Sequence, residues 1–131
     1  MHLVARTAVV VVAAVLLDSL YFHFSFKELY EKVWTKILHE DRLNIRVLPA
    51  ALAWTLIGVS VVVACETSDP RWSVPLCAFW GLAVYGVYNC TTLSVVDKLP
   101  LLTAVVDTLW GVVVYTSLAL LYTRVLNNPE G

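Results

Sequence analysis

The stretch "LVARTAVVVVAAVLLDSLYF", residues 3–22, decides the fold of this chain. Its first fifteen residues carry a single charge, at Arg6, and are otherwise almost all apolar. An apolar run of about 18 residues or more is long enough to cross the hydrocarbon core of a bilayer as a helix. We therefore predict a membrane-spanning helix with one acid, Asp18, close to its end.

The composition of the whole chain supports a membrane protein. The 131 residues are 60% hydrophobic and 15% charged, whereas soluble domains are about 45–50% apolar and about 25% charged. A small soluble domain has too much surface to hide such a sequence. The net charge is −1 and there is no basic run, so we expect the lipid bilayer as a partner and no nucleic acid.

Further apolar segments follow the first, and two of them begin near a proline, Pro49 and Pro100, as helices often do. Backbone amides in hydrocarbon must be satisfied within the segment, so these are predicted helices. With short connections they form an antiparallel bundle. The first segment also imitates a signal peptide, but the residues after Leu17 make a poor cleavage site, so we expect it to be retained. The prediction is an all-α integral membrane four-helix bundle, a single domain over residues 1–131, with spans at about 3–22, 47–65, 74–93 and 101–122.

The longest connection, between the first two spans, has helical periodicity over about residues 26–42. Apolar side chains fall on one side and charged ones mostly on the other, which predicts an amphipathic helix. It lies in the headgroup region or continues the first span, and it covers one end of the bundle or docks a partner. The apolar side comprises Phe26, Leu29, Tyr30, Val33, Trp34 and Ile37, and the charged side Lys27, Glu28, Glu31, Lys32 and Lys36.

Lysine and arginine counts predict the orientation. Cytoplasmic loops carry the excess of these residues, and six lie on the side of the first and third connections against three on the other. The first connection is therefore predicted to be cytoplasmic. The six are Lys27, Lys32, Lys36, Arg42, Arg46 and Lys98, and the three are Arg6, Arg71 and Arg124.

Polar side chains recur at one depth in every span. Asp18 and Asn89 each lie about four residues before their spans leave toward the first-connection side, and Asp107 lies about seven residues into the span that enters from it. Trp54 and Thr55 lie at a similar depth in the second span. Because residues three or four apart share a helix face, these side chains are predicted to meet inside the bundle.

The predicted site is therefore a polar cluster inside the bundle, which could bind protons or ions. Its core is Asp18, Asn89 and Asp107; its supporting residues are Tyr85, Tyr88, Thr92, Trp54, Thr55, Trp110 and Gly111; and His23 is a candidate at its edge. Intramembrane acids are functional candidates by default. A structural reading stays open, in which a protonated acid holds helices together.

Three cysteines occur, and two of them flank the second connection. Cys65 and Cys77 are close enough in sequence to approach one another, whereas Cys90 lies about 20 Å further along at helical rise. A disulfide between Cys65 and Cys77 and simple apolar packing of all three are both open. The spacing does not fit a zinc site.

These residues also resemble a known family. The stretch "YGVYNCTTLSVVDKLPLLTAVVDTLWG", residues 85–111, is similar to the signature of the DUF2177 family of small four-span membrane proteins, in which a Y-x-x-Y-D-L-T-N pattern precedes a proline and V-D-x-x-W-G. "LLDSLYF" and "LPAAL" resemble the family's first and second spans. Asn89, Thr92 and Tyr21 depart from the family's Asp, Asn and Trp. The resemblance implies a fold and an acidic site, and no activity.

The function predicted from these features is a proton, cation or small-solute transporter or channel. The alternative is an accessory or assembly subunit of a larger membrane complex, with the polar cluster as a structural lock. Both expect a homo-oligomer or membrane-protein partners. An enzyme has little support, because no catalytic serine with an adjacent base, paired histidines or phosphate-binding loop is found. We expect no catalytic residues, cofactor or metal.

Overall fold

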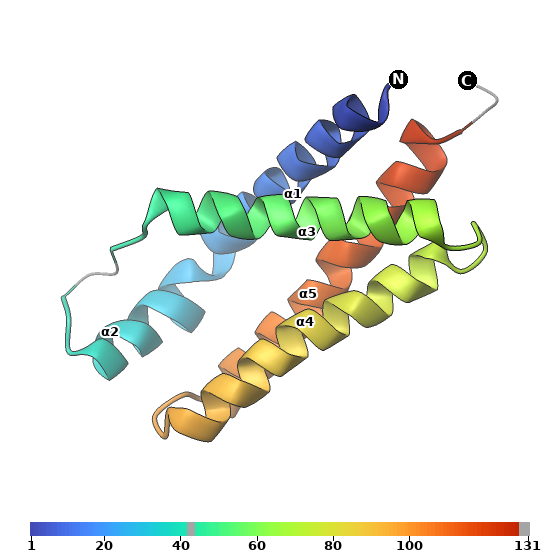
Figure 1. The fold of residues 1–131 in the computed structure, drawn as a ribbon. Helices are drawn as coiled ribbons and strands as arrows, with labels where there is room; N and C mark the ends of the chain where they lie inside the picture. Colours follow the sequence, from blue (N-terminus) through green and yellow to red (C-terminus); the bar gives the residue numbers. More distant parts are fainter. Residues whose placement is uncertain (42–43, 129–131) are drawn as a thin grey trace.

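The computed structural model describes residues 1–41 and 44–128, and this part of the chain contains helices and no strand (Figure 1). The prediction of an all-α membrane bundle with an amphipathic segment after the first span is confirmed. The elements are α1 (Leu3–Ser25), η1 (Phe26–Glu31), α2 (Lys32–Leu38), α3 (Val47–Thr67), α4 (Ser73–Val95), α5 (Leu101–Leu121) and η2 (Tyr122–Leu126).

Four helices in the described residues are long and apolar enough to cross a membrane: Leu3–Ser25, Val47–Thr67, Ser73–Val95 and Leu101–Leu126. Large apolar side chains on their outer faces are exposed, among them Leu16, Leu56, Val87 and Leu109. Such a surface is unfavourable in water and favourable against lipid tails. The outer faces of these helices therefore suit contact with the lipid tails of a bilayer.

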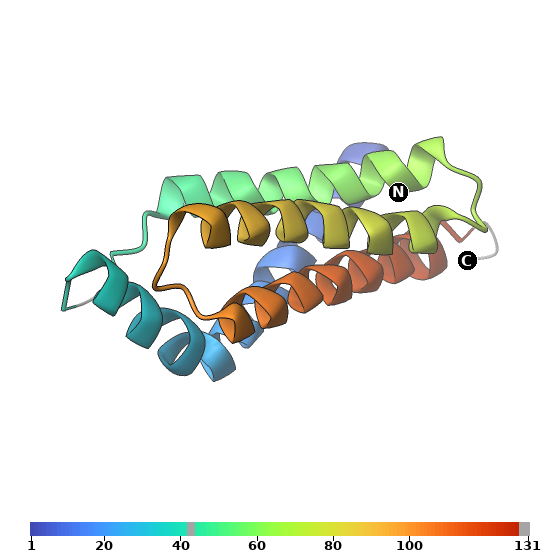
Figure 2. The same cartoon turned by 90° about the horizontal axis from the view of Figure 1, so that it is seen from below.

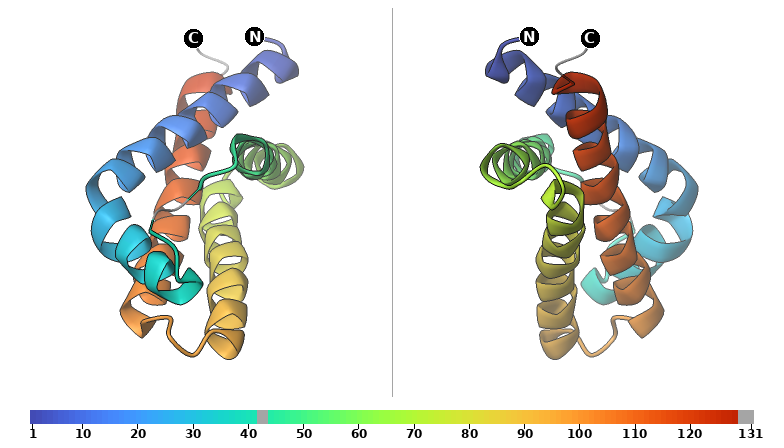
Figure 3. Two further views of the ribbon diagram at one scale, coloured as in Figure 1. Left: turned by 90° about the vertical axis from the view of Figure 1, so that its left-hand side faces the viewer. Right: turned by 90° about the vertical axis from the view of Figure 1, so that its right-hand side faces the viewer.

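The spans form an antiparallel pair and two helices that cross. Helices α4 and α5 lie side by side along their length (Figure 2), while α1 packs mainly on α3. Figure 3, which looks along α3, shows it end-on beside the α4–α5 pair, and Figure 1 shows that it crosses this pair obliquely. The beginning of α1 and the end of η2 lie at one end of the bundle, where Arg6 Nη1 donates a hydrogen bond to Asn127 Oδ1 at 2.7 Å.

Glycines permit the closest approach between α4 and α5. A Cβ atom on Gly81 would lie 2.4 Å from the carbonyl oxygen of Gly111, and one on Gly111 would lie 2.2 Å from Cγ of Tyr85. Small residues at helix contacts let backbones approach in lipid, where packing replaces the hydrophobic effect as the driving force. This contact fixes how α4 and α5 face each other.

The amphipathic segment continues α1. A π-helical turn, η1, leads into α2, which ends at Leu38 because His39 adopts a left-handed conformation (φ 56°). The described side chains of the predicted apolar side are half-buried, and Lys27, Glu28, Lys32 and Lys36 are exposed. The side chain of Phe26 and all of Arg42, both part of the predicted segment, lie outside the described residues.

The interior divides into two halves of different character. The larger apolar core lies toward the chain ends and the second connection, and includes Val10, Val61, Val114 and Leu118, with the buried hydroxyl of Ser73 at its edge. The half toward the first and third connections contains the buried polar side chains of Asp18 and Asn89. The packed half fixes the helix orientations, and so the polar half receives its side chains in a defined geometry.

Candidate functional site

Asp18 is sealed between three helices. It lies on α1, is only 7% exposed, and each of its carboxyl oxygens accepts a hydrogen bond from a different indole. Trp54 Nε1 on α3 donates to Oδ2 at 2.7 Å, and Trp110 Nε1 on α5 donates to Oδ1 at 2.8 Å. An indole N–H is a donor only. These two bonds therefore satisfy the acid and tie α1 to both α3 and α5.

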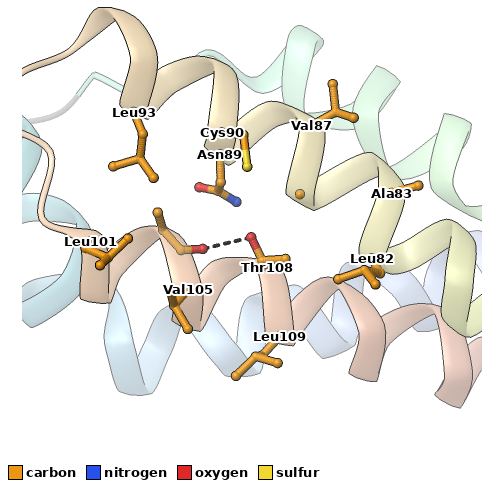
Figure 4. A pocket seen from close by; sticks show the side chains of 12 residues that line it. Leu82, Ala83, Val87, Asn89, Cys90, Leu93, Leu101, Val105, Thr108 and Leu109 are labelled. Atoms are coloured by element: carbon orange, nitrogen blue, oxygen red, sulfur yellow. Dashed lines mark hydrogen bonds between the residues drawn. The ribbon is translucent and has the colours of Figure 1, made fainter.

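Asp107 has the same pattern of partners on different elements. Asn89 Nδ2 on α4 donates to Oδ2 at 2.7 Å, and the Tyr30 hydroxyl on η1 donates to Oδ1. Asn89 also donates to the carbonyl oxygen of Tyr85 at 2.9 Å, and Figure 4 shows its amide extending from α4 toward α5. Asp107 is half-buried, so it is less enclosed than Asp18.

Two tyrosines connect the surroundings of the acids. The rings of Tyr21 and Trp110 are stacked, with centroids 4.4 Å apart and an interplanar angle of 6°. The hydroxyl groups of Tyr21 and Tyr30 are hydrogen-bonded at 3.0 Å. The cluster is therefore one continuous set of contacts from Trp54 through Asp18 and Trp110, and on through Tyr21 and Tyr30, to Asp107 and Asn89.

The partners of both acids are uncharged. In the part of the chain that the structure describes, the one ion pair joins Lys32 to Glu28 at 2.7 Å on the surface of the amphipathic segment. Burial, and next the hydrogen bond to Asp107, raise the pKa of the Tyr30 hydroxyl above its ordinary value. Tyr30 therefore stays a neutral donor to Asp107 across the physiological pH range.

Asp107 borders a cavity of about 520 Å³ between α3, α4 and α5. Most of the wall is aliphatic or aromatic, and the side-chain oxygens come from Asp107, Ser60 and the tyrosines. Ser60 and Tyr115 use their hydroxyl groups on each other, at 3.0 Å. The lining comprises Ala53, Leu56, Ile57, Ser60, Val84, Tyr85, Tyr88, Asp107 and Tyr115.

Two other hollows flank the cluster. One of about 670 Å³, between α1, η1 and α3, is lined by residues that include His23, Lys27, Tyr30 and Trp54. The other, of about 510 Å³, lies between α4 and α5, and its wall is almost wholly apolar (Figure 4). There the hydroxyl of Thr108 is occupied by the carbonyl oxygen of Ala104, at 2.8 Å.

The supporting residues predicted from the sequence have mixed positions. Trp54 and Trp110 hold Asp18, the ring of Tyr85 packs over Gly111, and Tyr88 lines the cavity although it is 59% exposed.

Two threonines of the predicted set use their hydroxyl groups within their own helices. Thr55 is exposed and donates to the carbonyl oxygen of Ala51, because one residue along a helix rotates the side chain by about 100° and Trp54 already faces inward. The Thr92 hydroxyl is taken up by the carbonyl oxygen of Tyr88, at 2.8 Å.

His23, a predicted candidate at the edge of the site, lines the hollow that also contains Tyr30 and Trp54. His23 is exposed, and its ring meets that of Phe24 edge-on. Cys65 and Cys77 are at the opposite end of the bundle, where their sulfur atoms are 3.9 Å apart and both are free thiols. Within the described residues no group of three or more His, Cys, Asp or Glu side chains is arranged to hold a metal ion.

Sequence reasoning missed the role of Tyr30. It placed this residue on the apolar side of the amphipathic segment and gave it no place in the site. The available signal was a hydroxyl on an otherwise apolar face, which needs a partner when it is buried. Tyr21 lies three residues after Asp18 on α1, and so on the same face, and its ring stacks on Trp110.

The chain was compared with known proteins. A family model described as "Predicted membrane protein (DUF2177)" matches residues 3–123. The searches of curated proteins and of solved structures gave no match.

Proposed function

The chain belongs to the DUF2177 family of predicted membrane proteins, and from that premise we propose that it is a small transporter or channel whose ion- or solute-binding group is Asp107. The proposal assigns different tasks to the two acids. Asp18 holds α1, α3 and α5 together, and Asp107 exchanges a proton, a cation or a small solute with the cavity beside it.

One observation carries the proposal: the Asp107 carboxyl group borders a cavity inside a membrane bundle and has only neutral partners. Placing an ionised carboxylate at the centre of a membrane helix costs roughly 2.5–3.5 kcal/mol on insertion scales. Ionisable residues inside membrane spans mark ion and proton pathways in many transporters and pumps. A positive charge bound in the cavity beside Asp107 would offset this free-energy cost.

Asp18 lacks these properties. It is nearly inaccessible, and both of its oxygens are occupied by indoles from neighbouring spans. A ligand would have to displace Trp54 or Trp110 and so separate the helices. Asp18 is accordingly assigned to structure, and Tyr30, which reaches Asp107 from the amphipathic segment, is assigned to control access to Asp107.

The test is flux through vesicles reconstituted with purified protein. Asp107→Asn keeps the size and the hydrogen-bonding groups of the side chain and removes its ability to carry a charge. We expect it to abolish proton or cation flux while the protein still folds. The matched control is Asp97→Asn, an exposed acid in the connection between α4 and α5. Flux that is equal in wild type and Asp107→Asn would refute the assignment.

A second function is favoured by the two indole bonds to Asp18. A cluster that joins three spans is what an accessory or assembly subunit needs if its polar groups act only as a lock. In that case the amphipathic segment, where Val33 and Trp34 remain half-exposed, docks the partner. Glutamates at both positions would then abolish co-purification of a partner from native membranes. Recovery of a clean homo-oligomer would count against this function.

A further inference from the structure

We infer that the cavity beside Asp107 binds a lipophilic organic cation, an inference that rests on the proposed role of Asp107 as a ligand-binding group and names the class of ligand. The cavity's volume of about 520 Å³ falls in the range of about 300–1,000 Å³ that is usual for small-molecule sites. Apolar walls with a few polar groups are also the usual composition of such sites.

The cavity opens toward the bilayer. Several lining residues are exposed on the lipid-facing side of the bundle, including Leu56 (69%), Tyr88 (59%) and Val84 (45%). All three lie within the helices long enough to span the membrane. A ligand that enters here comes from among the lipid tails, so its body has to be apolar.

The charge of the ligand follows from the surroundings of Asp107. Its two described donors, Asn89 and Tyr30, are neutral, and the described residues place no ion pair at this acid. An ionised carboxylate within a membrane span is costly unless an opposite charge offsets it. A cationic ligand supplies that charge, and an anionic one of the same shape would be repelled.

The aromatic side chains favour an organic cation. Tyr85 and Tyr115 meet edge-to-face, with ring centroids 6.5 Å apart and an interplanar angle of 86°, and Tyr88 stands at the rim of the same cavity. Aromatic faces attract cations through the negative charge above the ring, and proteins recognise quaternary ammonium groups in this way. Three tyrosines beside one carboxylate form such an environment.

A bare inorganic ion is a poorer match to the lining. Calcium takes about six to eight oxygen ligands and magnesium demands a near-ideal octahedron. Apart from Asp107, the side-chain oxygens of the described lining are hydroxyl groups, and those of Ser60 and Tyr115 already bond to each other. The site has too few free oxygens to replace the hydration shell of such an ion.

The experiment measures binding of radiolabelled tetraphenylphosphonium to the purified protein in nanodiscs. Tetraphenylborate, with the same shape and the opposite charge, is the control ligand. We expect saturable binding of the cation and none of the anion, and at least a tenfold weakening by Asp107→Asn. Asp97→Asn should bind as wild type. Ala53→Phe, which fills the cavity without altering the acid, should also weaken binding at least tenfold.

Absence of cation binding, equal binding of the anion, or full binding by both Asp107→Asn and Ala53→Phe would overturn the inference. Flux measured on the same variants separates it from the proposed function. Flux that depends on Asp107 in a protein that does not bind tetraphenylphosphonium would refute only the ligand class. Binding that depends on Asp107 in a protein without flux would support the site and refute transport.

Discussion

Asp18 and Asp107 have the same side chain at nearly the same depth, and their neighbours give them different properties. Asp18 accepts two indole N–H groups and is closed off, whereas Asp107 accepts an amide and a phenol and borders a cavity. The difference arises from the helices that face each acid. At the scale of single residues, the hydrogen-bond donors around each acid therefore determine its role.

Trp110→Phe tests the structural role assigned to Asp18. The phenyl ring can still pack on Tyr21, but the donor to Asp18 Oδ1 is lost. Interhelical polar contacts in a membrane protein are worth about 0.6 kcal/mol on average and up to about 1.7, and we expect a loss of unfolding free energy near the upper value. Denaturation of purified protein in detergent measures it.

Trp80→Phe is the control for that substitution, since Trp80 is on α4, is 46% exposed and packs on Phe79. It should change the unfolding free energy little. Equal losses for the two variants would mean that the indole bond to Asp18 contributes nothing beyond the size of the ring.

At the scale of elements, the contact between α4 and α5 depends on Gly81. Gly81→Ala would place a methyl group 2.4 Å from the carbonyl oxygen of Gly111, and backbone cannot yield as a flexible side chain does. Overpacking of this kind typically costs about 1–3 kcal/mol. We expect that loss of stability, together with disturbance of the nearby Tyr85 and of the cavity it lines. Thermal unfolding measures the first effect.

Gly86→Ala makes the same chemical change on the same helix, but its methyl group would lie 3.7 Å from Cγ2 of Thr108. That distance is an ordinary contact, and alanine favours a helix over glycine by about 1 kcal/mol. The variant should be neutral or slightly stabilising. A loss as large as that of Gly81→Ala would show that the close approach of α4 and α5 is not the cause.

The amphipathic segment is coupled to the spans through one hydroxyl. Tyr30→Phe removes the donor to Asp107 and the contact with the Tyr21 hydroxyl, and keeps the ring. We expect faster hydrogen exchange across η1 and α2, because local opening then costs less free energy. Tyr88→Phe, which alters an exposed hydroxyl, should leave that exchange unchanged. Unchanged hydrogen exchange in Tyr30→Phe would show that the hydrogen bond to Asp107 does not stabilise the amphipathic segment.

The sequence could predict the depth of the polar residues in the membrane, but not which side chains form hydrogen bonds with each other. Depth follows from the rise of a helix and the direction of each span, so Asp18, Asn89 and Asp107 could be placed in one leaflet. Pairing depends on the rotation of each helix and on the oblique crossing of α3, which no local pattern encodes. The sequence therefore predicted Thr55 inside the bundle beside Trp54. It did not predict the hydrogen bond from the Tyr30 hydroxyl to Asp107.

At the scale of the whole molecule, the bundle has a packed apolar half and a polar half with a cavity. The packed half, with Val10, Val61 and Val114 at its centre, gives the rigidity that a small membrane protein needs to hold acids in position. The cytoplasmic orientation of the first connection, which rests on its lysines and arginines, stays a prediction. A homo-oligomer or partner proteins also stay predictions. Of the two states left open for Cys65 and Cys77, the structure has the unbonded thiols.

The central claim, that Asp107 is reachable from the bilayer and Asp18 is sealed, is tested most directly by labelling with dicyclohexylcarbodiimide. This apolar reagent modifies carboxyl groups that it can reach from the bilayer, and peptide mass spectrometry identifies the modified residue. Labelling should modify Asp107, leave Asp18 intact, and disappear from the spans in Asp107→Asn. Modification of Asp18 in preference to Asp107, or of neither, would contradict the account.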